Sequence, residues 1–589
     1  MRVLVLVAAA FALYWTSLQY PLLFDDYHLG QYTLRTYYAA ALERFGQLRW
    51  FSDATFWWVN ALFGPEREWQ RLINVALHAA TALAIFGFLS RLFGAVLADA
   101  RARWLAFFGA LWFTVHPVAV YSVAYLMQRS IILATLFSLI SLWCVLEGLL
   151  RRSSRWYIAA ALAYLLALSS KEHAVMLPAV AVALAVLVRG ASRELLVRSA
   201  WWLGALVALA AIVIVQRRGL IGVAYEPYAA DVMARLGANP AIIFPLSVEN
   251  QANLFFRYVA TWLVPWPGWI SVDVRTAFPT QLIGWPHTAG FLAWLAYGVT
   301  AGWLLLRGGV LGLAGFGLAF PWLLGLTEMA AVRVQEPFVL YRSYLWMSGL
   351  PAILPALAFR WRIPVLGGVC VVFAVLAQQR IETFSNAFAL WDDAIRKQTD
   401  PPLPYSERAY LARGNYALDR ARYAEAGADF ARALEINPKS PDAFLLRGTL
   451  ALRTRRVPDA MADYDRALAL NPRYGAALRM RCVAKANLGR YSDALADCEQ
   501  AVRFEPTNDE AWVNTGAMQA AVGRVEDALE SYERALAINP GSAAAHNNYG
   551  MLLLQSGRRD LMVREHFVKA CQAGLAEACD HLARSRIEK

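Results

Sequence analysis

Two adjacent carboxylates, Asp25 and Asp26, directly follow the first apolar stretch of the chain. Residues 3–18 carry no charge, and only Arg2 precedes them among the basic residues. A helix of about 20 apolar residues crosses a bilayer, so the pair is expected where a membrane helix ends and an aqueous loop begins. A carboxylate at that boundary meets both water and a membrane-borne substrate. Such a group suits a general base that takes a proton from an acceptor hydroxyl.

Other ionisable side chains recur at the predicted membrane boundary on the same side. Any one of them is explained by a long side chain that reaches from a helix end to the interface. As a set they favour function, because ionisable groups at membrane depth are costly and generally functional. Arginine and lysine among them would stabilise the growing charge of a leaving phosphate. The set is Asp25, Asp26, His28, Arg35, His116, Arg129, Lys171, Glu172, His173, Glu336 and Arg342.

Eleven apolar segments before residue 380 are long enough to cross a membrane, and 58% of all residues are hydrophobic. Residues 3–20 are read as a retained helix, since no small-x-small cleavage site precedes Pro21. The remaining predicted spans are 72–90, 104–120, 130–149, 156–169, 174–188, 199–215, 288–306, 309–327, 343–358 and 363–378.

Arginines cluster in alternate short connections between these segments, as in 151–155, 189–198 and 360–362. Basic connections stay on the cytoplasmic side, so the N-terminus is predicted to be cytoplasmic. The opposite side then receives 21–71, 121–129, 169–173, 216–287, 328–342 and everything after 379. The net charge of +12 reflects this arrangement, and nucleic acid is not expected as a partner.

After residue 380 the sequence repeats every 34 residues. Prolines recur at 438, 472, 506 and 540, with glycine at the eighth position except for Cys482 and an aromatic at the twenty-fourth except for Cys498. This is the tetratricopeptide pattern of paired helices. Repeats are predicted at 407–440, 441–474, 475–508 and 509–542, with a degenerate fifth at 543–576 that has His566 and Lys569 at its aromatic and alanine positions. A capping helix is expected near 589.

The chain is therefore predicted to be all-α: a polytopic bundle over 1–380, a connector over 381–406 and a tetratricopeptide solenoid over 407–589. Such solenoids form concave surfaces that bind extended peptides or other proteins. A solenoid that only stabilises the membrane domain or makes it dimerise is an equal alternative, because consensus positions do not identify a partner.

The six cysteines divide into two groups. Cys144 and Cys370 fall inside predicted spans, where a thiol behaves as a small apolar side chain. Cys482 and Cys498 replace residues that face each other across one repeat, and Cys571 and Cys579 lie in the terminal helices. In an oxidising compartment each of these two pairs is a candidate disulfide.

Several short motifs, in their order along the chain, resemble one family. Phe24-Asp25-Asp26 follows the first helix, and Asn74-Val75-Ala76-Leu77-His78 comes next. The later motifs are Phe113-Thr114-Val115-His116-Pro117-Val118, Gln128-Arg129, Leu168-Ser169-Ser170-Lys171-Glu172, Glu336-Pro337-Phe338 and Tyr341-Arg342-Ser343-Tyr344-Leu345. With the repeats, they resemble the transmembrane-and-tetratricopeptide O-mannosyltransferases and their bacterial relatives, which are type-C glycosyltransferases.

The resemblance implies transfer of a sugar from a polyprenyl-phosphate donor to protein hydroxyls. It maps the family's proposed base onto Asp25 or Asp26, and it makes Arg129, Lys171 and Arg342 ligands of the donor phosphate. His116, Glu172, Tyr341 and Glu336 would support them. The motif after His116 departs from the family, because Ala119, Val120 and Tyr121 stand where a second His and a Glu often occur. Some type-C enzymes use a divalent metal, and the Asp25–Asp26 pair could ligate one, although two carboxylates alone do not make a site.

We therefore expect a bacterial inner-membrane enzyme with its repeats in the periplasm, where they recruit a protein acceptor. Two alternatives remain open. One is transfer to a glycolipid or an envelope polysaccharide. The other is a non-catalytic scaffold for the assembly of pili or secretion machinery, which would tolerate replacement of both aspartates.

Overall fold

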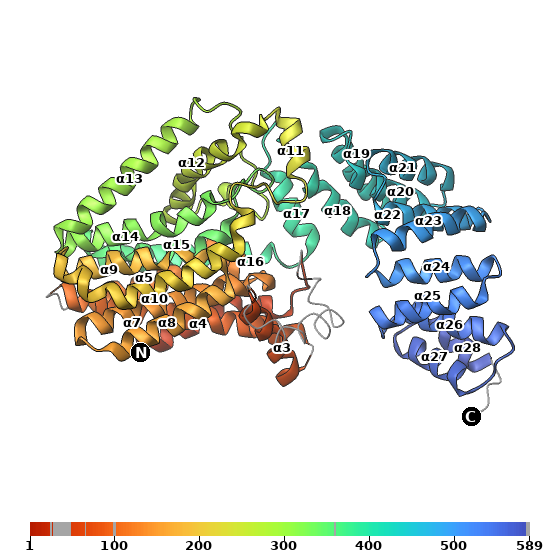
Figure 1. Ribbon diagram of the computed structural model, residues 1–589, viewed down its shortest axis with the longest axis horizontal. Coiled ribbons are helices and arrows are strands. Elements are labelled where there is room, and N and C mark those ends of the chain that lie inside the picture. Colours follow the sequence, from red (N-terminus) through yellow and green to blue (C-terminus); the bar gives the residue numbers. More distant parts are fainter. Residues whose placement is uncertain are drawn as a thin grey trace. The chain divides into compact units, whose positions relative to one another are not determined.

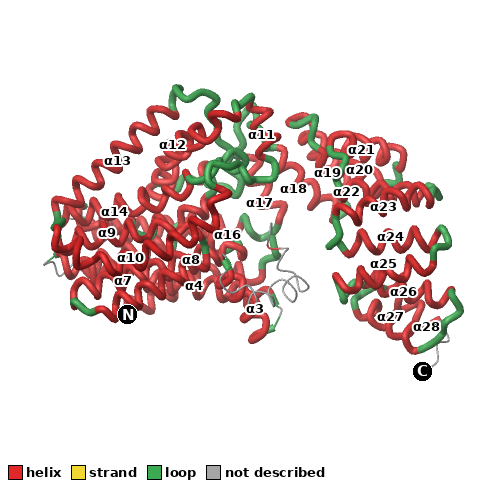
Figure 2. Tube along the Cα trace, viewed as in Figure 1, coloured by secondary structure: helices red, strands yellow, loops and turns green. Residues whose placement is uncertain are grey.

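The computed structural model describes residues 1–23, 26, 47, 49–64, 66–97, 102–357 and 361–584. Asp25, His28 and Arg35 lie outside these residues. The described residues form helices joined by loops and contain no strand (Figure 2), which confirms the all-α fold. The chain divides into two compact units, Met1–Tyr405 and Ser406–Lys589.

The first unit is a bundle in which α7 (Arg129–Arg151) packs against α4 (Arg67–Val96), α8 (Ser154–Ser170) and α9 (Leu177–Arg189) (Figure 1). Its long helices are α1 (Arg2–Tyr14), α3 (Trp50–Phe63), α4 (Arg67–Val96), α5 (Ala102–Thr114), α7 (Arg129–Arg151), α8 (Ser154–Ser170), α9 (Leu177–Arg189), α10 (Arg193–Arg217), α12 (Ile243–Leu263), α13 (His287–Arg307), α14 (Gly309–Gly325) and α16 (Arg362–Glu382). Shorter helices are α6 (Val120–Val123), α11 (Ala229–Leu236), α15 (Ser343–Met347) and α17 (Ala387–Arg396).

Within the described residues, eight helical segments are long and apolar enough to cross a membrane, and the bent pair of α5 with Pro117–Val123 makes up to nine. The protein is thus a multi-pass membrane protein. Two of the eleven expected spans differ. The segment at 156–169 is the helix α8, whose 17 residues make it short for a span. The segment at 343–358 is split into α15 and a 3₁₀ helix, Leu350–Ala356, that contains Pro351 and Pro355, because proline removes helical backbone donors.

The long outer stretch expected at 216–287 is partly inserted into the bundle. Trp262, in the last turn of its helix α12, is fully buried. The indole ring stacks on Phe113 with centroids 5.5 Å apart, and its Nε1–H donates to Ser343 Oγ at 2.8 Å. The apolar face of α12 therefore joins the core. The sequence does not indicate this, because polar residues interrupt the apolar residues of the helix.

The second unit is a stack of helix pairs whose bounds follow the 34-residue period (Figure 1). A glycine of the first helix faces an aromatic of the second: a Cβ at Gly448 would lie 2.7 Å from the Tyr464 ring. The pairs are α18 (Glu407–Asp419) and α19 (Tyr423–Ile436), α20 (Pro441–Arg453) and α21 (Val457–Leu470), α22 (Gly475–Asn487) and α23 (Tyr491–Phe504), α24 (Asp509–Ala521) and α25 (Val525–Ile538), and α26 (Ala543–Gln555) and α27 (Leu561–Gln572), followed by α28 (Ala576–Arg584).

The fifth repeat is more regular than its sequence indicates. The residues in the aromatic and alanine positions are Phe567 and Ala570, both fully buried, and not His566 and Lys569. A Cβ at Gly550 would lie 3.2 Å from the Phe567 ring. The connection between α26 and α27 is longer than in the other repeats, so counting at a fixed period places the wrong residues in the core.

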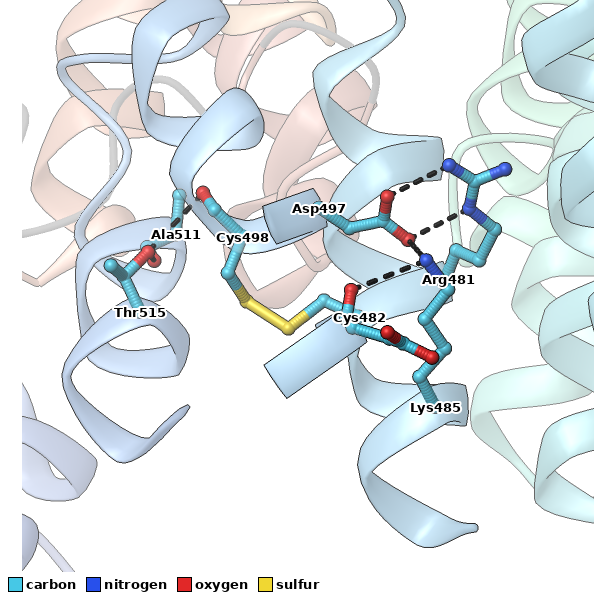
Figure 3. Close-up of a disulfide and its surroundings, with 8 residues drawn as sticks. Arg481, Cys482, Lys485, Asp497, Cys498, Ala511 and Thr515 are labelled. Atoms are coloured by element: carbon cyan, nitrogen blue, oxygen red, sulfur yellow. Dashed lines mark hydrogen bonds and ion pairs between the residues drawn. A yellow bond between two sulfur atoms is a disulfide. The ribbon is translucent and has the colours of Figure 1, made fainter. Parts of the chain in front are cut away.

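The third repeat replaces the glycine–aromatic contact by a covalent link between α22 and α23 (Figure 3). Cys482 and Cys498 form a disulfide with their Cα atoms 5.6 Å apart. Beside it, Arg481 donates two hydrogen bonds to Asp497, both of 2.8 Å, and Lys485 Nζ lies 2.6 Å from the same carboxylate. Cys571 and Cys579 form a second disulfide. Both pairings expected from the sequence are therefore present.

Loss of the Cys482–Cys498 link is expected to lower the free energy of unfolding of the repeat unit by about 3 kcal/mol, the value typical of a loop of this length. A Cys482→Ser/Cys498→Ser variant of the full chain should melt at a lower temperature than wild type in non-reducing detergent solution. A Cys482→Gly/Cys498→Tyr variant restores the contact of the other repeats and should recover most of that loss. Equal melting temperatures for wild type and the serine variant would contradict the prediction.

Candidate functional site

Asp26, which follows the first helix, forms hydrogen bonds with the segment that precedes α7. Its carboxylate is fully buried and accepts hydrogen bonds from the backbone N–H groups of Leu126, at 3.3 Å, and Met127, at 3.0 Å. Arg71 of α4 joins the same two segments by donating to the carbonyl oxygens of Pro21, at 2.5 Å, and Ala124, at 2.8 Å. Asp26 therefore has a structural role in addition to any chemical one.

Burial raises the pKa of Asp26 to about 7, although the nearby Arg71 guanidinium and the backbone donors act in the opposite direction. A raised pKa means that the folded protein binds the proton more tightly than the unfolded chain. The contribution of Asp26 to stability is thus fully present below its ordinary pKa of 3.8 and is lost as the pH rises to about 7.

We expect the melting temperature of wild type to fall as the pH rises from about 4 to about 7. In Asp26→Asn, the part of this fall that is due to Asp26 should be absent. The amide of Asn does not titrate, and its oxygen still accepts a hydrogen bond. Thermal unfolding in detergent across this range, followed by intrinsic fluorescence, measures the difference between the two proteins. Parallel pH profiles would show that Asp26 does not contribute in this way.

Arg129, one of the predicted phosphate ligands, lies inside the bundle. Its Nε donates to Asn74 Oδ1 at 2.7 Å, and Nη2 donates to the backbone and side-chain oxygens of Gln70, both at 2.8 Å. The guanidinium also lies 3.8 Å from the centroid of the Phe56 ring. The side chain is fully buried, so it joins α7 to α4 and α3 and positions the neighbouring Gln128.

Lys171 lies at the centre of the cationic residues. Its Nζ donates to Gln128 Oε1 at 2.9 Å and stands 4.9 Å from the centroid of the Tyr341 ring. Burial lowers the pKa of Lys171 to about 7, and the positive charges of Arg49 and Arg342 act in the same direction. The lysine thus lies in a position where an added anion would be stabilised.

Arg49, which no sequence pattern indicates, completes this group of cations. It immediately precedes α3 and forms a bidentate pair with Glu172, with distances of 2.5 and 3.0 Å. The Glu172 carboxylate raises the pKa of Arg49 further above its usual range. Glu172 therefore holds the Arg49 guanidinium near Lys171. Its partner is 123 residues away in the chain, a separation that sequence pattern does not bridge.

A second acid, Glu328, joins three basic side chains. Its carboxylate lies 2.9 Å from His173 Nε2, 3.2 Å from Arg342 Nη1 and 3.7 Å from Arg333 Nε. Arg342 also donates to the backbone carbonyl of Glu336 at 3.1 Å, while the carboxylate of that residue is 3.9 Å away. Glu328 follows α14, at the start of the segment 328–342 that the sequence predicts as an outer loop.

The residues predicted to support the phosphate ligands lie in two different parts of the bundle. Tyr341 and Glu336 contact Lys171 and Arg342, as described above. His116 instead caps the turn at Pro117: Nδ1 accepts from the N–H of Val118 at 3.1 Å, so Nε2 carries the proton that it donates to the Trp262 carbonyl at 2.8 Å. Its ring stacks on Trp262, with centroids 4.2 Å apart. His116 thus joins the turn after α5 to α12.

A cavity of about 130 Å³ lies beside the ionic cluster. Polar side chains meet an apolar surface here, an arrangement that suits the junction of a phosphate group with a lipid chain. The polar lining includes Glu172, His173, Arg217, Tyr225 and Arg333, and the apolar lining includes Val175, Val213, Ile214, Leu220 and Ile221.

The described residues include no group of three or more His, Cys, Asp or Glu side chains arranged around a common point. Both carboxylate oxygens of Asp26 accept backbone N–H groups. Asp25, the other half of the pair considered for a divalent metal, lies outside the described residues.

Comparison with known proteins indicates glycosyltransferase activity for the membrane unit and a helical repeat domain after it. Residues 51–216 match the family described as dolichyl-phosphate-mannose-protein mannosyltransferase. Four overlapping segments, 411–475, 445–511, 480–543 and 519–561, match the tetratricopeptide repeat. The two matches confirm the resemblance to the transmembrane-and-tetratricopeptide O-mannosyltransferase-like family.

Similar solved structures concern the repeats. A tetratricopeptide protein of Thermus thermophilus, TTC0263, is 23% identical, with 30% of this chain and 98% of that chain covered and a TM-score of 0.28. MamA of Desulfovibrio magneticus RS-1 is 19% identical, with 30% and 97% covered and a TM-score of 0.26. Pseudomonas aeruginosa pilF is 21% identical, with 30% and 87% covered and a TM-score of 0.27. No curated protein matches this chain.

Proposed function

We propose that this protein transfers a sugar from a polyprenyl-phosphate donor to Ser or Thr hydroxyls of exported proteins. The observation that carries the proposal is the cluster of Lys171, Arg49, Arg342 and Arg333 beside a cavity with an apolar wall. The matched mannosyltransferase family supports the reaction class. The arginine distribution supports a bacterial inner-membrane location with the site and the repeats on the periplasmic side.

Asp25 is the proposed base. It would take the proton of the acceptor hydroxyl as the hydroxyl oxygen attacks the anomeric carbon of the sugar and the bond to the lipid phosphate breaks. Of the two adjacent aspartates, Asp26 is already engaged with the backbone of Leu126 and Met127. Asp26 is thus a positioning residue that fixes the exit of the first helix.

Lys171 and Arg342 are the proposed phosphate ligands, with Arg49 and Arg333 adding positive charge. Negative charge grows on the phosphate as the sugar leaves, so preorganised cations stabilise the transition state more than the ground state. The acidic residues Glu172 and Glu328 hold the two arginines Arg49 and Arg342 in place before the donor arrives. Arg129 acts indirectly, through Gln128 and the start of α7.

The tetratricopeptide unit is proposed to recruit the protein acceptor, since such solenoids bind extended peptides on their concave faces.

Deleting the gene and profiling periplasmic proteins by intact mass and glycopeptide analysis tests the whole proposal. A glycan mass that disappears on deletion and returns with the wild-type gene is expected. Unchanged protein masses with an altered glycolipid would move the acceptor to a lipid or polysaccharide. If the double variant Asp25→Asn/Asp26→Asn fully rescued the deletion phenotype, the protein would act only as a scaffold.

A further inference from the structure

A second and larger cavity, of about 450 Å³, lies at the other end of the helices that carry Lys171. It is formed where α7 passes into α8 and where α9 passes into α10, whereas Lys171 and Gln128 lie at the opposite ends of α8 and α7. These two connections are among the basic ones that the positive-inside rule assigns to the cytoplasm. Its lining includes Arg152, Tyr157, Arg189, Glu194, Arg198 and Trp201.

Positive charge dominates this lining. Arg152, Arg189 and Arg198 face a single carboxylate, Glu194, which pairs with Arg198 at 2.7 Å. Arg189 is held by a hydrogen bond to the Leu149 carbonyl. Arg152 forms no ion pair with any residue that the structure describes. The cavity thus has an excess of cationic groups, with serine hydroxyls as additional donors.

One wall of the cavity is rigid and aromatic. Tyr157 stacks on Trp202 with ring centroids 5.0 Å apart and an interplanar angle of 6°, and it meets Trp201 edge to face at 5.6 Å. A Cβ at Gly148 would lie 2.8 Å from the Tyr157 ring, so glycine is required for this packing. Tyrosine and tryptophan favour the membrane interface, where a polar edge and an apolar face are both satisfied.

The surface next to the cavity is apolar and exposed. Ile158 and Leu162 of α8 are 56% and 61% exposed, and Val197 and Trp201 of α10 are 69% and 53% exposed. On a membrane-spanning helix such side chains contact lipid. A cationic cavity therefore continues directly into a surface that contacts acyl chains.

We propose that this cavity binds the headgroup of an anionic phospholipid from the cytoplasmic leaflet. The phosphate would lie among Arg152, Arg189 and Arg198, and the acyl chains would follow Ile158, Leu162 and Trp201. Basic cavities between membrane helices on this side bind such headgroups. The site differs from the proposed donor site in its residues and in its end of the bundle, and it would link the packing of α7–α10 to lipid composition.

Native mass spectrometry of the full chain with added phosphatidylglycerol or phosphatidylethanolamine tests the proposal. Wild type should retain phosphatidylglycerol in preference to phosphatidylethanolamine. An Arg152→Gln/Arg198→Gln variant should bind phosphatidylglycerol at least about tenfold more weakly. The matched control, Arg155→Gln/Arg193→Gln, removes two charges from the same connections without changing the cavity lining and should keep the wild-type affinity.

The Glu194→Gln variant provides a test in which the expected result is tighter lipid binding, which misfolding would not produce. It removes the only carboxylate of the lining, so it should tighten phosphatidylglycerol binding by severalfold; an unchanged affinity would overturn the proposal. Equal losses in the two double arginine variants would also overturn it, because they would indicate diffuse attraction only. If glycerol 3-phosphate displaced the lipid at equal concentration, the site would be one for soluble phosphate, and the lipid assignment would fall.

Discussion

Replacing Asp25 with Asn is expected to lower turnover by about 10²–10⁴-fold, the usual contribution of a general base, without changing the melting temperature. The amide has nearly the shape of the carboxylate, but it cannot take up the proton of the acceptor hydroxyl. Initial rates with a saturating lipid-linked donor and an acceptor peptide, in purified membranes with matched protein levels, give the comparison with wild type.

Asp26 provides the matched control next to it. Asp26→Ala removes the acceptor of two buried backbone N–H groups, each of which costs about 1–3 kcal/mol when left unsatisfied. We therefore expect a clear loss of stability, whereas Asp26→Asn should keep most of the fold and a measurable rate. Full activity of Asp25→Asn together with an inactive but stably folded Asp26→Asn would reverse the assignment and make Asp26 the base.

Replacing Lys171 with Met should lower kcat/KM for the donor by about 10- to 150-fold, because a hydrogen bond to a charged group contributes about 1.5–3 kcal/mol. Met keeps the volume of the stem and places no charge beside Arg49 and Arg342. The variant should fold normally, since burial of the charged amine is already unfavourable, as its lowered pKa shows.

The pH dependence separates phosphate binding from a structural role of Lys171. The charged amine is the form that binds phosphate, and the pKa of Lys171 in the donor-free protein is about 7. Donor affinity should therefore fall as the pH rises above about 7 in wild type, because binding then requires uptake of a proton. In Lys171→Arg the guanidinium stays charged, so this pH dependence should disappear. Unaltered donor use by Lys171→Met at low donor concentration would exclude the lysine as a ligand.

The repeats illustrate what is readable without a structure. Each helix pair buries a local pattern of glycine, alanine and aromatic residues, so a period of 34 residues predicts the helices from α18 to α26 closely. Prediction from the period fails where chain length changes. The longer connection before α27 brings Phe567 into the core in place of His566, a shift that depends on packing against Gly550.

The candidate site depended more on tertiary structure. The sequence by itself determined the apolar spans, the alternation of basic connections and the boundary position of Asp26, Lys171 and Arg342, because these follow from local composition and the thickness of a bilayer. Whether a cation at that boundary faces a cavity or the interior depends on which helices pack together. Arg129 and Lys171 look alike in the sequence, yet Gln70 and Asn74 of α4 enclose the first, whereas the second is followed by Glu172, which lines the cavity.

Only the tertiary structure decided which acids pair with which bases. Glu172 pairs with Arg49 across 123 residues, and Glu328 gathers His173, Arg333 and Arg342 from separate segments. Such long-range pairs leave no periodic signal, because each charge satisfies a partner brought near by helix packing and not by chain proximity. The sequence therefore determined the class of protein and the side on which its chemistry is expected, and the packing of α3, α7 and α14 decided which residues form the site.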